Sequence, residues 1–178
     1  MKIETNLLTR NEWSRPGKKL KNIRGIVLHW TADPRASALN IHNFFESRQF
    51  GELNYGSSHY VVGLKGEVIQ MIPDEEMAYH VGSQKPYTEF ARQKFGTYPN
   101  NCTIGIEMCV LDAEGSYDKD TWKSAVELCA DLCKRHRLDP YRDITTHQSI
   151  VGWKICPKWF RDHPEDLVLF RLEVSNVI

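Results

Sequence analysis

Two short segments in the last third of the chain hold side chains that are suited to metal chemistry. His147 lies in Thr146–Ser149, and Lys154 and Cys156 follow it in Trp153–Pro157. Imidazole and thiolate are ligands that zinc prefers in proteins, and packing does not explain a lysine beside them. In an extended segment, residues two apart point to the same side, so Lys154 would lie over whatever Cys156 binds. The pattern predicts a metal site with a cation placed to stabilise a developing oxyanion.

Two upstream segments can add a histidine and a carboxylate to this site. Ile23–Trp30 is apolar on both faces, which is typical of a buried strand, and His29 lies near its end. Thr103–Cys109 alternates between an apolar face and a small, polar face that carries Glu107. Because strand ends build clefts in α/β sheets, we expect His29 to share a metal with the later histidine and cysteine. Glu107 would form part of the cleft floor.

Each of these residues also has a plainer interpretation. A lone histidine at a strand end is usually a satisfied polar residue, and Glu107 could be an ordinary exposed carboxylate. Cys156 could be a nucleophile paired with His147, because Cys–His pairs carry out acyl transfer. A cysteine hydrolase, however, has no need of Lys154. Glutamate near a metal-activated water is the usual general base of amide hydrolysis, which favours the functional interpretation of Glu107.

The remaining histidines and cysteines give weaker signals. His59 begins one strand-like segment and His80 ends another, so either could contact a substrate, support the site or be structural. Cys129 and Cys133 are four residues apart in a helical Val/Leu stripe and are expected to pack in the core. Three histidines in helical or terminal contexts are expected at the surface: His42, His136 and His163.

The rest of the pattern predicts an α/β fold with a mixed central β-sheet flanked by helices. Helical spacing over Ser37–Phe45 offers an apolar side made of Leu39, Ile41, Phe44 and Phe45. The other expected elements are two short strands, 58–64 and 67–72, that form a hairpin; a long loop, 82–101, with one helical turn around Phe90; a long helix, 120–138; and a short strand, 144–147. The tail, 166–178, is expected to form a final helix or to wrap around the domain.

Length and composition exclude several classes of function. A chain of 178 residues fits one domain with a proper core, and we expect a monomer. Lysine plus arginine equals aspartate plus glutamate, at 23 each, so no basic field favours nucleic acid or an anionic membrane as a partner. The first residues lack the apolar region of a Sec signal peptide. The five cysteines are an odd number and predict reduced thiols in a protein made in the cytosol.

These segments, in this order, resemble the zinc-dependent N-acetylmuramoyl-L-alanine amidases of type 2, which are related to peptidoglycan recognition proteins and phage lysins. The resemblance covers about residues 22–160, which is most of the chain. Single segments are weak signals, but five in register are specific. The segments that carry it are Ile26–Thr31, Ser58–Val62, Ala78–Gly82, Thr103–Glu107 and Thr146–Ser149 through Lys154–Pro157.

The resemblance implies a residue-by-residue assignment of the site. His29, His147 and Cys156 would be the zinc ligands, Glu107 the catalytic base and Lys154 the partner of the oxyanion. The substrate would be peptidoglycan, cut at the amide bond between N-acetylmuramic acid and L-alanine. The protein would act on the cell wall after phage-type release or non-Sec export. The main alternative hypothesis is a peptidoglycan-binding module without catalysis. The intact His-His-Cys set argues against this alternative.

Two positions depart from the pattern of the family. Some relatives carry a catalytic tyrosine just before the strand histidine, where this chain has Ser58. The Ile-Gly-Ile-Glu strand resembles the branch of Gram-positive phage and prophage lysins, in which Glu107 would take that role. Tyr79 stands where many relatives have tryptophan. We expect residues 1–178 to form a single catalytic domain, because too little chain follows residue 160 for a wall-binding module.

Overall fold

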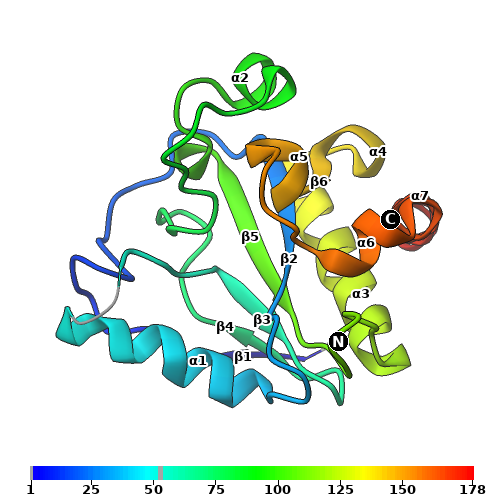
Figure 1. Ribbon diagram of the computed structural model, residues 1–178, viewed down its shortest axis with the longest axis horizontal. Coiled ribbons are helices and arrows are strands. Elements are labelled where there is room, and N and C mark those ends of the chain that lie inside the picture. Colours follow the sequence, from blue (N-terminus) through cyan, green and yellow to red (C-terminus); the bar gives the residue numbers. More distant parts are fainter. Residues whose placement is uncertain (1, 52–53) are drawn as a thin grey trace.

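A computed structural model describes residues 2–51 and 54–178. Its centre is a six-stranded sheet in the order β1-β4-β3-β5-β2-β6 (Figure 1). The strands are β1 (Ile3–Thr5), β2 (Gly25–Trp30), β3 (Tyr60–Val62), β4 (Val68–Gln70), β5 (Thr103–Met108) and β6 (Ile144–Thr146). The helices are α1 (Ala38–Ser47), η1 (Arg48–Phe50), α2 (Glu89–Phe95), η2 (Pro99–Asn101), α3 (Lys119–His136), α4 (Pro140–Asp143), α5 (His147–Val151), α6 (Lys158–Asp162) and α7 (Pro164–Val177).

The sheet is mixed, as the sequence predicts. β3 and β4 form the expected antiparallel hairpin, whereas β3–β5, β5–β2, β2–β6 and β1–β4 pair in parallel. The two longest strands, β2 and β5, lie side by side in the middle of the sheet. Parallel strands end at the same edge of a sheet, so the carboxyl ends of β2 and β5 bring their last residues together.

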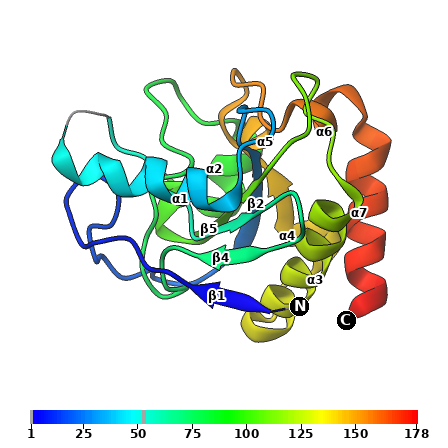
Figure 2. The ribbon, with the colours of Figure 1, turned by 90° about the horizontal axis from the view of Figure 1, so that it is seen from below.

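Helices cover both faces of the sheet. One face packs against α3 and α7, which lie side by side in Figures 1 and 2, and Ile26, Leu28, Ile104 and Ile106 contribute to this core. On the other face, α1 packs on β3 and β4, and α2 packs on α5. The candidate site residues of β2 and β5, His29 and Glu107, point to this second face, because they alternate with the side chains that face α3.

The prediction of a helix over Ser37–Phe45 is confirmed, and the predicted apolar side is right for Ile41 and Phe45 but wrong for Leu39 and Phe44. The buried residues of α1 are Ala38, Ile41, His42 and Phe45, which follow the i, i+3, i+4, i+7 spacing of one helix face. Leu39 and Phe44 lie off that stripe and are 53% and 48% exposed. His42 occupies the stripe and is buried, so its expected surface position is also wrong.

Two further expectations need correction. The segment 82–101 contains more structure than one turn, because it holds both α2 and η2. Thr88 caps α2 by accepting from the amide of Ala91, and this helix buries Ala91 and Phe95. The expected strand 144–147 ends at Thr146, and His147 begins a helix. β1 was not expected at all.

The long helix and the final helix agree with the sequence. Cys129 and Cys133 belong to α3 and are buried in the core, as expected. His163 is at the surface, whereas His136 is largely covered and pairs with Asp74, contrary to its expected surface position. Of the helices in the described parts of the chain, none combines the length and apolar character needed to cross a membrane.

Candidate metal centre

His29 and Glu107 reach the site from two neighbouring strands. They are direct register partners on β2 and β5 and therefore point to the same side of the sheet. His29 is 2% exposed, whereas Glu107 is partly exposed. Two residues earlier on the same face are Val27, which is fully buried, and Gly105, which has no side chain. The polar side chains on this face of the two strands therefore lie near the strand ends.

His147 is held at the first position of a short helix. The side chain of Thr146 accepts a hydrogen bond from the backbone N–H of Ser149 and caps α5. Thr146 is also the last residue of β6, which pairs with β2. The strand-to-helix turn therefore fixes the backbone of His147 next to the strand that carries His29.

The loop that follows α5 places Cys156 beside His29 and His147. The helix ends at Gly152, whose φ of 78° is strained for other residues. Four residues later, the carbonyl of Cys156 accepts a 2.8 Å hydrogen bond from the backbone N–H of Gln148. This bond draws the loop back to the start of α5, and Cys156 lies 3% exposed beside the two histidines.

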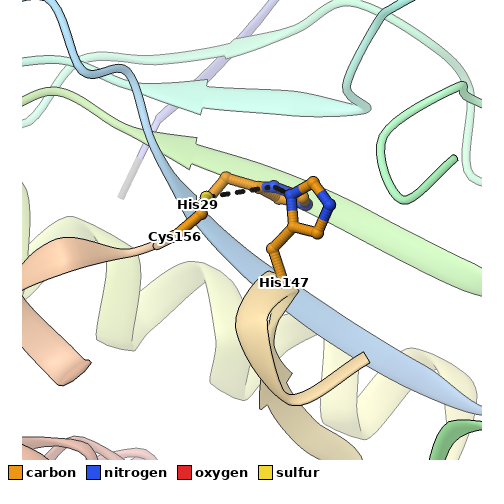
Figure 3. A group of neighbouring side chains, drawn as sticks. All are labelled: His29, His147 and Cys156. Carbon is orange, nitrogen blue, oxygen red and sulfur yellow. Dashed lines mark hydrogen bonds between the residues drawn. The ribbon is translucent and has the colours of Figure 1, made fainter. Parts of the chain in front are cut away.

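Figure 3 shows that the three side chains point toward one another from β2, α5 and the following loop. The Nδ1 atoms of His29 and His147 are 3.1 Å apart, and Cys156 Sγ lies 3.7 Å from His29 Nδ1. All three ligand atoms lie within 4.8 Å of one another. A tetrahedral zinc separates two nitrogen ligands by about 3.3 Å and a nitrogen from a sulfur ligand by about 3.6 Å. The cluster therefore fits a metal ion of this kind.

The surroundings keep both imidazoles neutral, which is the state that binds a metal. Burial lowers the pKa of His29 well below its usual value, and the neighbouring His147 and His80 lower it further. Burial, followed by the charge of Lys154, lowers the pKa of His147 to about 3. The Cys156 thiol has its pKa raised to about 12, first by burial and then by Glu107. Without a cation, this thiol therefore stays protonated.

Glu107 and Lys154 line the same groove as the three clustered residues, and the groove has a volume of about 1510 Å³. Burial raises the pKa of Glu107 to about 8, while the ammonium of Lys154 opposes the shift. Lys154 is exposed and acts electrostatically on His29, His147 and Cys156 as well. The structure thus brings the five residues of the sequence prediction to one place.

His80 and His59 have different environments. His80 is 7% exposed, lines the groove, and has its Nδ1 3.0 Å from His29 Nε2. His59 is fully buried; its Nδ1 accepts from the backbone N–H of Gly105, and its Nε2 lies 2.9 Å from the carbonyl of Glu76. Both ring nitrogens of His59 are occupied by backbone groups. Its predicted contact with substrate does not agree with this burial, and its placement is that of a structural residue.

Two residues near the site have roles that were not expected from the sequence. The side-chain oxygen of Asn100 accepts from the backbone N–H groups of His80 and Val81, and Asn100 is fully buried. Thr103, the first residue of β5, contacts His80 Nε2 through its hydroxyl. An asparagine in a polar loop and a threonine at a strand start carry no pattern that distinguishes them from ordinary turn and strand residues.

Comparisons with known proteins agree with this geometry. The family model described as N-acetylmuramoyl-L-alanine amidase matches residues 19–159. A probable N-acetylmuramoyl-L-alanine amidase of Bacillus licheniformis is 38% identical over an alignment of 180 positions, which covers 100% of this chain and 48% of the relative. The amidase BlyA of Bacillus subtilis strain 168 is 35% identical, over 98% of this chain and 47% of its own length. The chain thus spans about half the length of the curated relatives it matches.

Solved structures give the same fold at lower identity. PlyL is 24% identical and superposes with a TM-score of 0.76 over 98% of this chain and 97% of its own. The catalytic domain of XlyA is 22% identical, with a TM-score of 0.74 over 98% and 99% of the two chains. At these identities the likeness shows the fold alone, and the sequence matches carry the assignment. This chain belongs to the type 2 N-acetylmuramoyl-L-alanine amidase family.

Proposed function

We propose that this chain is a zinc-dependent hydrolase that cleaves the amide bond between N-acetylmuramic acid and L-alanine in peptidoglycan. The observation that carries the proposal is the convergence of two imidazoles and one thiol in a groove that also contains Glu107 and Lys154. The family membership supports the same reaction. The substrate is the bacterial cell wall, on which the protein acts to lyse it.

His29, His147 and Cys156 would hold the zinc ion. Three protein ligands leave a fourth position open, which is typical of catalytic rather than structural zinc sites. A zinc ion bound there supplies a Lewis acid that polarises the amide carbonyl and lowers the pKa of water toward roughly 7. Metal binding also requires loss of the Cys156 proton, so the affinity of the site for zinc should rise with pH.

Glu107 is proposed as the general base. The carboxylate accepts a proton from the attacking water as the new C–O bond forms at the lactyl carbonyl. It then returns that proton to the nitrogen of the departing L-alanine as the C–N bond breaks. A base is most effective when its pKa lies near the working pH, and burial moves the pKa of Glu107 up from the usual carboxyl range.

Lys154 is proposed as the partner of the oxyanion. Its ammonium interacts electrostatically with Glu107 and with Cys156. Lys154 also lines the groove next to Cys156. During attack, negative charge develops on the carbonyl oxygen, where a fixed cation is worth roughly 3–4 kcal/mol if the values for oxyanion-hole donors apply. Lys154 would supply this stabilisation only as the tetrahedral intermediate forms.

The rival hypothesis of a cysteine nucleophile has less support. A nucleophilic cysteine needs a lowered pKa, usually from a neighbouring protonated histidine. The pKa of Cys156 is instead raised to about 12, and burial keeps His147 neutral. The other alternative hypothesis is a binding module without catalysis. Such a module would not need Glu107 held at the edge of a complete His-His-Cys cluster.

A lysis assay on purified cell walls separates the three hypotheses. The amidase should lose activity when a chelator removes the metal and recover it when zinc is added. A cysteine hydrolase would survive the chelator and be inactivated by a thiol-alkylating reagent. A binding module would sediment with the walls without reducing their turbidity under any of these conditions.

A further inference from the structure

We propose that His80 is a positioning residue that fixes the proton of His29 on Nε2 and thereby directs the lone pair of Nδ1 to the metal. This inference rests on the proposed metal site and assigns a task to a residue outside the ligand set. It follows from the hydrogen-bonding groups around the two rings.

Two oxygen acceptors face His80 Nε2. The backbone carbonyl of Thr103 lies 3.2 Å away and can only accept a hydrogen bond. The hydroxyl of Thr103 lies 3.1 Å away and donates its single proton to the carbonyl of Pro99 at 2.8 Å. The hydroxyl therefore also faces His80 as an acceptor. Both contacts require a proton on His80 Nε2.

A neutral imidazole with its proton on Nε2 is an acceptor at Nδ1. His80 is buried, and none of its hydrogen-bonding partners among the described residues is a carboxylate, so the neutral ring is favoured. Its Nδ1 lies 3.0 Å from His29 Nε2, which must then donate. The proton of His29 is thus on Nε2, and its Nδ1 carries a free lone pair.

That lone pair points at the other two ligand atoms. His29 Nδ1 is the atom that lies 3.1 Å from His147 Nδ1 and 3.7 Å from Cys156 Sγ. The opposite form of His29 would place a proton on Nδ1, in the position that a metal takes. Ligands of metals usually have their second ring nitrogen fixed by such an outer partner, whose loss typically lowers metal affinity 10- to 100-fold.

The surrounding chain is shaped to hold the His80 ring. A Cβ atom added at Gly105 would lie 2.6 Å from Cγ of His80, so only glycine leaves room for the ring on this face of β5. Asn100 fixes the backbone of His80 from the other side, through hydrogen bonds of 3.2 Å and 2.9 Å to the N–H groups of His80 and Val81. The backbone that carries the His80 ring is therefore held in place.

His147 provides an internal contrast. Its Nε2 is buried and has no hydrogen-bonding partner in the described part of the chain. Among the described residues, no outer partner holds Nε2 of His147 in the way that His80 holds Nε2 of His29. The two histidines of the cluster are held differently, so loss of His80 should disturb His29 and leave the orientation of His147 unchanged.

The first test needs no variant. In the metal-free wild-type protein, nitrogen-15 NMR of the histidine side chains should show His29 protonated at Nε2 and unprotonated at Nδ1, with the same form for His80. A proton on Nδ1 of His29 in the folded, metal-free protein would overturn the inference. This result does not depend on zinc affinity or on activity.

The second test compares two substitutions of His80. His80→Asn places an amide oxygen close to the position of Nδ1 and keeps the acceptor, whereas His80→Leu removes it. Competition with a chromophoric chelator should show zinc bound 10- to 100-fold more weakly by His80→Leu. His80→Asn should restore most of the affinity. The matched control is His42→Leu, which removes another buried histidine outside the site and should bind zinc like wild type.

The outcomes separate this inference from the proposed function. Wild-type protein that binds no zinc contradicts the proposed function itself. Wild-type protein that binds zinc, together with a folded His80→Leu that binds it equally well, contradicts only the role of His80. If His80→Leu does not fold, as judged by near-UV circular dichroism, the comparison moves to His80→Asn. A loss of affinity in that folded variant as large as that of Cys156→Ser would overturn the acceptor role.

Discussion

His29 and Glu107 occupy paired positions at the carboxyl ends of two adjacent parallel strands, β2 and β5. This pairing explains how a proposed ligand and a proposed base come to share one groove without sharing a loop. Strand pairing fixes the relative position of their Cα atoms more firmly than a loop would. Cys156 and Lys154, by contrast, lie on the loop after α5 and depend on its backbone bond to Gln148.

The ligand assignment predicts the metal content of a cysteine variant. Cys156→Ser should lose most of its zinc, because a serine hydroxyl is a far weaker ligand than a thiolate. Metal analysis of the purified proteins measures this directly. Cys102→Ser is the matched control, because Cys102 is also buried but donates to the carbonyls of Phe95 and Pro99. Equal zinc in wild type and Cys156→Ser would remove the cysteine from the ligand set.

The role of Glu107 predicts a loss of activity without a loss of metal. Glu107→Ala should keep the fold and the zinc and should lower wall-lytic activity by roughly 10²- to 10⁴-fold, as expected for removal of a general base. Turbidity assays and metal analysis on the same samples make the comparison. Glu4→Gln alters an exposed strand carboxylate at the edge of the sheet and should have no effect. Turnover close to wild type in Glu107→Ala would place the base elsewhere.

Lys154 should contribute to turnover more than to binding. In its proposed role, its ammonium would pair with charge that is absent from the bound substrate, so Lys154→Met should lower kcat by roughly 10²-fold. KM for a soluble muropeptide should change little. Lys119→Met, at the exposed start of α3, serves as the control for loss of a lysine charge. A sharp rise in KM at constant kcat would instead make Lys154 a clamp for carboxylates of the peptide stem.

The buried histidines predict loss of stability in acid. Burial lowers the pKa of His59 from 6.5 to about 4. Between these pH values the unfolded chain binds a proton that the folded chain excludes, so the free energy of unfolding falls as the pH drops from 6.5 toward 4. The loss from His59 alone is on the order of 3 kcal/mol.

Urea unfolding of the metal-free protein at pH 7 and pH 4.5 measures this loss. His59→Leu should be less stable than wild type at pH 7, because the backbone N–H of Gly105 loses its acceptor. The stability of this variant should nevertheless change less between the two pH values. An unchanged dependence on pH in His59→Leu would show that His59 does not contribute to the acid loss.

The sequence predicted the central strands and the site better than the periphery. Ile23–Trp30 and Thr103–Cys109 carry strong patterns, since one has apolar residues on both faces and the other alternates with a carboxylate on its polar face. The positions of His147 and Cys156 at the ends of such segments made their convergence predictable. Their expected roles as zinc ligands came from the family resemblance, because spacing alone left a nucleophilic cysteine open.

The errors have physical causes. In α1, the strongest apolar residues do not define the buried face, because His42 takes a position that Leu39 or Phe44 was expected to fill. β1 is short, and its pairing with β4 depends on a partner far along the chain, which no local pattern reveals. His136 is covered because Asp74 pairs with it across 62 positions of sequence. The orientation of His80 likewise depends on contacts from η2 and β5.

The central claim is most directly tested by identifying the bond that is cut. A synthetic muramyl peptide, incubated with the zinc-loaded protein, should yield a free lactyl carboxylate on the sugar and a peptide with L-alanine at its new amino terminus. Mass spectrometry of the products measures both fragments, and chelation should abolish them until zinc is restored. Cleavage within the peptide or the glycan, or the same products at full rate in chelator with a metal-free protein, would contradict the account.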